Sequence, residues 1–228
     1  MTYAQDERAA LAALLEETGP DGPTLCEGWQ TRDLVAHLVL RERRPDAAAG
    51  VIGGPLASYT ARVQQQFLDR YSYPQLIALF RAGPPRLSLF AIPGADDAAN
   101  TVEYFVHHED VRRAAGEWTE RALDESLSQT LWKRLKGARM FLRSAPTGLT
   151  LATERLGDAA RPGDTARPGD GAQSGRLDMI VAKQGEPSVT VTGSPAELTL
   201  WAMGRAGAAN VTLDGSDEAV ARLTAWRS

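Results

Sequence analysis

The chain has 228 residues, a formal net charge of −4, and 43% hydrophobic and 24% charged residues. These values are ordinary for a globular protein with a core, and the acidic balance argues against broad nucleic-acid binding. No apolar run approaches the roughly 20 residues that a membrane-spanning helix needs. Charged residues near the start argue against a signal peptide, so we expect a cytoplasmic protein with no nucleic-acid or membrane partner. The single cysteine, Cys26, excludes an intrachain disulfide and a multi-cysteine zinc site.

Up to about residue 145 the sequence predicts helices separated by turn signals. We expect Thr31 to be the N-cap of the second helix and Gly116 to follow the end of the fifth. An apolar periodicity close to that of a helix marks the predicted segments, which lie around residues 9–15, 31–44, 58–68, 75–82, 97–115 and 123–141. The basic cluster that ends the second helix, Arg41, Arg43 and Arg44, is explained by the helix C-terminus and solvent, with contact to an anionic substrate as the alternative.

After Pro146 the pattern changes to short strands with alternating side chains. Strands are predicted around residues 148–154, 176–183, 187–193 and 210–215, and helices after Ser194 and over 216–226. Ser194, with Glu197 three residues later, has the form of a capping box. We therefore predict an α+β protein with a helical domain over 1–145 and a small α/β domain over 146–228. A polar segment at 157–175, with a repeated Arg-Pro-Gly-Asp, is predicted to be a mobile loop.

Three histidines are all that the chain contains, and one of them, His107, follows Glu103 by four residues in a predicted helix. Residues four apart lie on one helix face, so this carboxylate and imidazole can point at a common ligand. With His37 from the second helix they would form a metal site of two histidines and one carboxylate that keeps positions open. The simpler alternative is a hydrogen-bonded Glu–His pair with His37 an unrelated core histidine, since this spacing is common.

Neighbouring residues have separate predicted roles. Asp110 falls within about 40° of Glu103 on the helical wheel and would orient a ligand from behind. His108 points away and is expected to be exposed or at a domain contact. Cys26 lies in a predicted loop with no histidine adjacent in sequence, and a small buried thiol is the commoner outcome than a catalytic or ligating one.

Two longer segments, PTLCEGWQTRDLVAHLVLRERRPDA and NTVEYFVHHEDVRRA, add a resemblance to these patterns. Together they resemble the mycothiol-dependent maleylpyruvate isomerase family, and through LCEGW and RERRPDA they are most similar to its actinobacterial-type metal-binding branch. The resemblance implies a DinB-like four-helix bundle as the N-terminal domain. It also implies that His37, Glu103 and His107 hold a divalent metal, usually zinc.

The C-terminal segments SPAELTLWAMGR and NVTLDG resemble the small α/β domain, related to sterol carrier proteins, that follows the bundle in that family. The resemblance implies that Arg205, which follows Gly204, reaches the site and holds a substrate carboxylate. An arginine facing solvent in the last turn of its helix is the equally weighted alternative.

These features favour a metalloenzyme that activates a low-molecular-weight thiol such as mycothiol against a small electrophilic substrate. It would be a thiol S-transferase if the sulfur stays attached and an isomerase if the sulfur leaves after bond rotation. A metal-dependent hydrolase is one alternative, and a non-catalytic protein that binds metal or an apolar ligand is another. Two histidines and a carboxylate also suit iron, nickel or manganese, so zinc rests on the resemblance.

Overall fold

A computed structural model describes residues 2–48, 57–85, 94–154 and 177–227, and the predicted loop at 157–175 lies outside these ranges. The chain divides into two compact units, residues 1–120 and 121–228. The first unit is helical and the second combines helices with a sheet, which confirms the predicted α+β class. Within the described ranges, every helix is too short or too polar to cross a bilayer.

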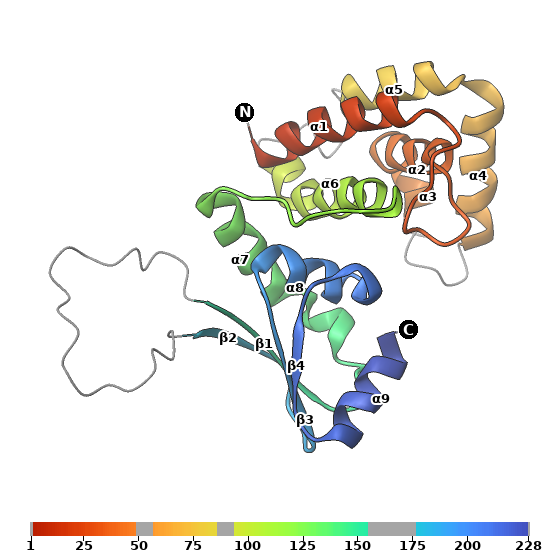
Figure 1. The fold of residues 1–228 in the computed structure, drawn as a ribbon. Helices are drawn as coiled ribbons and strands as arrows, with labels where there is room; N and C mark the ends of the chain where they lie inside the picture. Colours follow the sequence, from red (N-terminus) through yellow and green to blue (C-terminus); the bar gives the residue numbers. More distant parts are fainter. Residues whose placement is uncertain (1, 49–56, 86–93, 155–176, 228) are drawn as a thin grey trace, which may run out of the picture. The chain divides into compact units, whose positions relative to one another are not determined.

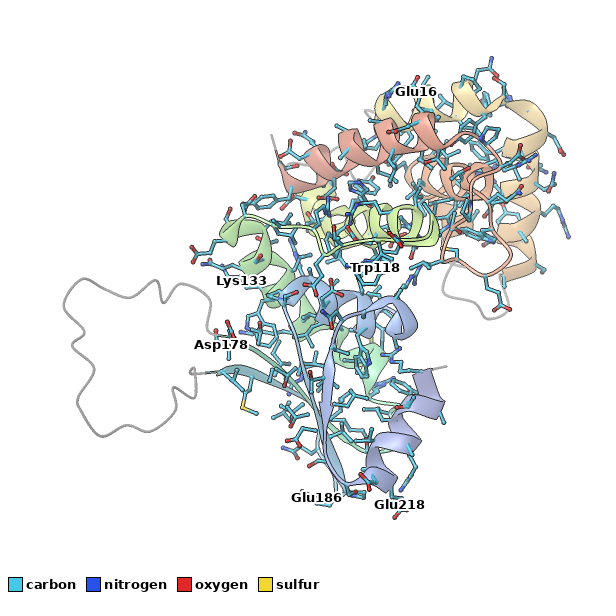
Figure 2. All side chains as sticks on the ribbon, in the orientation of Figure 1. Glu16, Trp118, Lys133, Asp178, Glu186 and Glu218 are labelled. Atoms are coloured by element: carbon cyan, nitrogen blue, oxygen red, sulfur yellow. The ribbon has the colours of Figure 1, made fainter. Side chains whose placement is uncertain are left out.

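Six helices are described in the first unit (Figure 1). They are α1 (Tyr3–Thr18), α2 (Thr31–Arg43), α3 (Pro45–Ala48), α4 (Ala57–Arg70), α5 (Tyr73–Arg81) and α6 (Ala95–Ala114). The fully buried apolar side chains of the main core come from α1, α2, α5 and α6, while Val63 of α4 packs with Leu40 in a smaller cluster. On the surface, Glu16 of α1 pairs with Arg81 of α5 at 2.5 Å (Figure 2), an exposed ion pair of the kind that adds little stability.

The N-cap of helix α2 lies one residue earlier than predicted. Gln30 has the extended backbone of an N-cap, and its N–H donates to Asp33 Oδ2 at 2.9 Å. The prediction of Thr31 as the cap is wrong because this side chain is buried and its hydroxyl donates to the carbonyl of Gly19. The start of α2 is thereby tied to the end of α1.

A buried polar network, called here the arginine network, joins α1, α2 and α6. Arg8 Nη2 donates to Glu42 Oε1 at 3.1 Å, to Tyr104 Oη at 2.9 Å and to Asp96 Oδ1 at 3.0 Å. Tyr104 Oη in turn donates to Glu42 Oε1 at 2.5 Å. A guanidinium that meets two carboxylates and a phenol fixes the register of the three helices, because each lost partner would leave a buried charge unpaired.

The second unit is built on a four-stranded sheet (Figure 1). Its elements are α7 (Glu125–Leu142), β1 (Gly148–Glu154), β2 (Leu177–Lys183), β3 (Ser188–Thr192), α8 (Pro195–Ala202), the 3₁₀ turn η2 (Ala206–Ala208), β4 (Thr212–Asp214) and α9 (Asp217–Arg227). The strand order is β2-β1-β3-β4, with β1 parallel to β3 and the other neighbours antiparallel. All four predicted strands are therefore present.

Helix α7 belongs to the second unit, whereas the change in sequence pattern predicts the domain boundary after residue 145. Its Trp132, Leu135 and Leu142 share a core with the sheet, α8 and α9. At the start of α8, Ser194 Oγ accepts from the N–H of Glu197 at 3.3 Å, which is one of the two hydrogen bonds of the predicted capping box. The Glu197 carboxylate accepts from the N–H of Asn210 at 2.7 Å, so it holds the loop before β4.

Candidate metal centre

The central element of the candidate site is α6, which carries three of its side chains. Asp96 and Asp97 lie in its first turn and Arg112 and Arg113 in its last, the charge order that the helix dipole favours. Arg112 and Arg113 both pair with the buried Glu109, at 2.8 and 2.7 Å. These charges stabilise the two ends of α6, and its middle contacts α2 through Glu103 and His37.

The structure brings His37, Glu103 and His107 together, and these three are called the donor set below. Glu103 Oε1 lies 3.3 Å from His37 Nε2 and 3.2 Å from His107 Nε2. One atom from each residue lies within 4.8 Å of the others, and both imidazoles are buried. The two rings meet edge to face, with centroids 5.3 Å apart. The predicted neighbours on α2 and α6 thus converge on one point.

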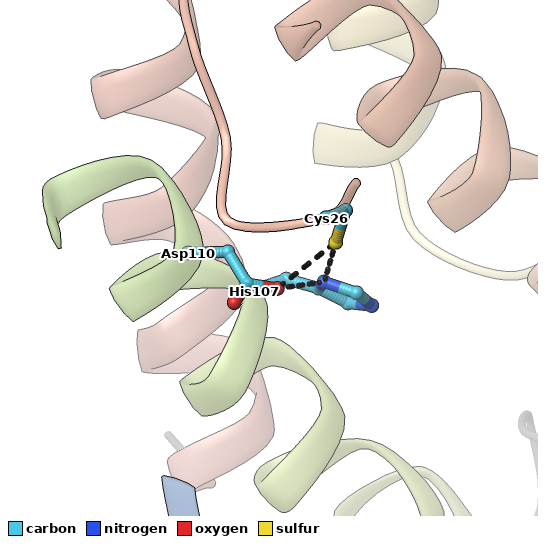
Figure 3. A group of neighbouring side chains, drawn as sticks. All are labelled: Cys26, His107 and Asp110. Carbon is cyan, nitrogen blue, oxygen red and sulfur yellow. Dashed lines mark hydrogen bonds and ion pairs between the residues drawn. The ribbon is translucent and has the colours of Figure 1, made fainter. Parts of the chain in front are cut away.

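The second ring nitrogen of His107 faces away from the donor set, toward Asp110 (Figure 3). Nδ1 lies 2.8 Å from Asp110 Oδ2, and the Cys26 thiol donates to the same oxygen at 3.2 Å. Cys26 Sγ is also 3.9 Å from His107 Nδ1. The loop is pinned here because the N–H of Leu25 donates to the carbonyl of Asp110 at 3.1 Å. A carboxylate behind a ligating histidine fixes the ring and its tautomer, as predicted for Asp110.

Burial and hydrogen bonds set the charges of this cluster. Burial lowers the pKa of His37, and the positive charges near it add to that effect. Burial acts in the same sense on His107, but its bonds with Asp110, Cys26 and Glu103 outweigh burial and raise its pKa well above the usual value. Burial opposes ionisation of Glu103, yet hydrogen bonds from both histidines bring its pKa well below the usual range. Glu103 is therefore a carboxylate at neutral pH.

Two further side chains contact the donor set, and the sequence patterns predict neither contact. Arg41 Nε lies 3.3 Å from Glu103 Oε1, and the Trp29 ring packs against the His37 ring with centroids 5.1 Å apart. The signal for Arg41 was available, because it follows His37 by four residues on the same helix face. The predicted interaction of the basic cluster with the helix C-terminus therefore accounts for Arg44 but not for Arg41.

His108 does lie away from the donor set, but it is buried rather than exposed. Its Nδ1 is 3.0 Å from Glu7 Oε2 of α1, and the side chain is 10% exposed. The expectation of an exposed ring fails because α1 covers this side of α6. This buried histidine on the same helix offers a matched control for experiments on His107.

The residues present fit a divalent cation. Two imidazole nitrogens and one carboxylate oxygen converge, which is the three-ligand pattern of open metal sites, and His107 has the supporting carboxylate that such ligands usually have. Cys26, His107 and Asp110 form a second group of candidate ligand atoms, but it would use His107 Nδ1. His107 therefore offers a different nitrogen to each group, Nε2 to the donor set and Nδ1 to the second group.

Comparisons with known proteins bear on this geometry. Residues 2–128 match the family model described as the mycothiol maleylpyruvate isomerase N-terminal domain. The chain belongs to this family. Two solved structures of the mycothiol-dependent maleylpyruvate isomerase are also similar, each 16% identical and covering 93% of this chain and 90% of theirs. The TM-score is 0.54 for a histidine-to-alanine mutant and 0.46 for the other structure. At this identity the likeness to the mutant structure shows the fold alone. A comparison with curated proteins found no match.

The remaining predicted site residue, Arg205, lies in the second unit. It follows α8, is half-buried, and its Nη1 donates to the carbonyl of Met203 at 2.6 Å. Its own N–H donates to the carbonyl of Leu200 at 2.9 Å, which helps to end α8. Its contact with a substrate stays a prediction.

Proposed function

We propose that this member of the mycothiol maleylpyruvate isomerase family is a metal-dependent enzyme, either a thiol S-transferase or an isomerase, that uses mycothiol as its thiol. The observation that carries the proposal is the convergence of His37 Nε2, Glu103 Oε1 and His107 Nε2. Family membership supports the choice of thiol, and the donor set supports a divalent metal, for which we favour Zn²⁺.

The bound ion would supply the Lewis acidity that converts a thiol to its reactive thiolate at neutral pH. The chain's own residues prepare this site. Asp110 holds His107 with Nε2 directed at Glu103, and Arg41 contacts the same Glu103 oxygen as the two histidines. Trp29 packs on His37 and limits the freedom of that ring. A donor set fixed in this way needs little rearrangement to bind its ion.

In the proposed reaction the thiolate sulfur adds to one carbon of an electron-poor double bond in a small anionic substrate, and the π electron pair moves onto the adjoining carbonyl group. Protonation of this adduct gives the product of a transferase. In an isomerase the adduct instead rotates about the bond that is now single and then expels the thiolate, which restores the double bond. Arg205 is the group proposed to hold the substrate carboxylate, a role for which the two-pronged guanidinium is suited.

The test measures metal content and mycothiol binding on the same samples. Wild type, His37→Ala and the control His108→Ala are purified, loaded with Zn²⁺, analysed by mass spectrometry for metal, and titrated with mycothiol by calorimetry. We expect one metal per chain and thiol binding in wild type and in the His108 variant, and neither in the His37 variant.

Either of two results would contradict the proposal. If wild type holds no metal after loading, the donor set is only a hydrogen-bonded cluster. If metal binds but mycothiol does not, thiol chemistry fails, and a metal-dependent hydrolase becomes the preferred function.

A further inference from the structure

The second unit contains an apolar cavity that no part of the proposed function uses. Its volume is about 280 Å³, close to the lower end of about 300 Å³ for small-molecule sites. The cavity lies between the end of α8, η2, β4 and α9, and Trp201, Val211, Leu213 and Leu223 supply much of its wall. A space of this size and lining fits the apolar body of a small ligand.

One charged side chain, Arg227, also lines this cavity. Its guanidinium lies over the rings of Trp201 and Trp226, 4.8 and 4.1 Å from their centroids. Nη2 donates to the carbonyl of Ala202 at 3.0 Å, at the C-terminal end of α8. These contacts fix the group and partly offset its burial.

The charge of Arg227 nevertheless has no carboxylate within ion-pair distance among the described residues. The Nε atom of Arg227 is buried, and no described residue accepts a hydrogen bond from it. Burial lowers the pKa of Arg227 to about 10, so the group is still charged at neutral pH. By contrast, the buried Arg8 and Arg113 each have a carboxylate at about 3 Å or less. A half-buried cation with one unsatisfied N–H beside an apolar cavity is favourable for an anion with an apolar body.

We propose that this cavity binds a small monocarboxylate, with the carboxylate on the Arg227 guanidinium and the hydrocarbon part against the apolar wall. The assignment uses only the second unit and does not depend on the metal centre. A carboxylate would supply hydrogen-bond acceptors for guanidinium N–H groups that lack them, and the hydrocarbon part would cover apolar surface.

The test uses hexanoate as the probe and hexan-1-ol as its neutral counterpart. Each is titrated into ¹⁵N-labelled wild type while the indole N–H signals are followed by NMR, with those of Trp201 and Trp226 assigned by Trp→Phe substitution. We expect saturable shifts of these two signals with hexanoate, and at least tenfold weaker binding of hexanol.

Three variants separate the charge from the cavity. Arg227→Gln should weaken hexanoate binding at least tenfold, whereas Arg222→Gln, which changes an exposed arginine of the same helix, should leave it unchanged. Ala209→Leu narrows the cavity, retains Arg227, and should abolish binding of both probes. Hexanoate bound equally well by wild type and Arg227→Gln, hexanol bound as tightly as hexanoate, or no saturable shift with either probe would each overturn the proposal.

Discussion

Helices α2 and α6 hold two buried polar clusters that differ in the kinds of group they bring together. In the arginine network, the Arg8 cation lies between two carboxylates and a phenol, so each charge has an opposite charge beside it. In the donor set, three groups that carry lone pairs point at one another, and only protons on the histidines and Arg41 hold them together. In the first arrangement the protein itself supplies an opposite charge for each charged group. The second gains most from a cation at its centre.

Removing one member of the arginine network should have the largest effect on stability. Glu42→Ala leaves Arg8 with Asp96 as its one remaining carboxylate among the described residues. It also removes the acceptor of the Tyr104 hydroxyl, and we expect a loss of about 3 kcal/mol in the free energy of unfolding. Urea denaturation measures this loss. Zn²⁺ content should remain at the wild-type value, and a variant that is as stable as wild type would show that the network is not structural.

Removing one member of the donor set should instead lower metal affinity strongly and stability little. Glu103→Ala deletes the only carboxylate of the set and should lower Zn²⁺ affinity by at least about 100-fold, a change of about 2.7 kcal/mol. Competition with a fluorescent chelator gives the affinity. Unfolding of the metal-free variant should change much less than that of Glu42→Ala, and an unaltered affinity would exclude Glu103 as a ligand.

Replacing the supporting carboxylate, Asp110, should have an intermediate effect on Zn²⁺ affinity. Asp110→Asn keeps the shape of the side chain but replaces the carboxylate that fixes His107, and we expect Zn²⁺ affinity to fall about 10- to 100-fold with the metal still bound at one per chain. The same competition assay decides this. Complete loss of metal would instead place Asp110 among the ligands themselves.

Removing the Cys26 thiol should have the smallest effect on Zn²⁺ affinity. Cys26→Ala removes one hydrogen bond to Asp110 and should lower Zn²⁺ affinity less than tenfold, while Cys26→Ser retains a donor and should be closer to wild type. A loss of 100-fold or more in Cys26→Ala would favour the second ligand group, in which the thiolate binds the metal.

The sequence predicts the parts of these clusters that depend on spacing within one helix. Glu103, His107 and Asp110 share a face of α6 because residues three, four and seven apart must do so. His37 is separated from Glu103 by most of the first unit, so periodicity leaves open whether it joins the set or is an unrelated core histidine, and the resemblance favours the set. Contact between Cys26 and His107 depends on how a loop crosses α6, which local sequence does not encode.

The errors have a similar origin in tertiary packing. His108 lies on a face that would be exposed if α6 stood alone, and α1 covers it. Thr31 is a good capping residue, but its hydroxyl bonds to the loop that precedes α2, so Gln30 takes the cap position. Helix α7 has the composition of a helical domain, and only the three-dimensional arrangement shows that it packs with the sheet.

The packing of α7 also determines where the chain can be divided. A fragment that ends at residue 145 would carry Trp132, Leu135 and Leu142 without the sheet that buries them, and a fragment that begins at 146 would leave the other side of the same core open to water. Both pieces would tend to aggregate. Division between residues 120 and 121 leaves each hydrophobic core whole, so this is the position at which the two halves can be prepared and studied separately.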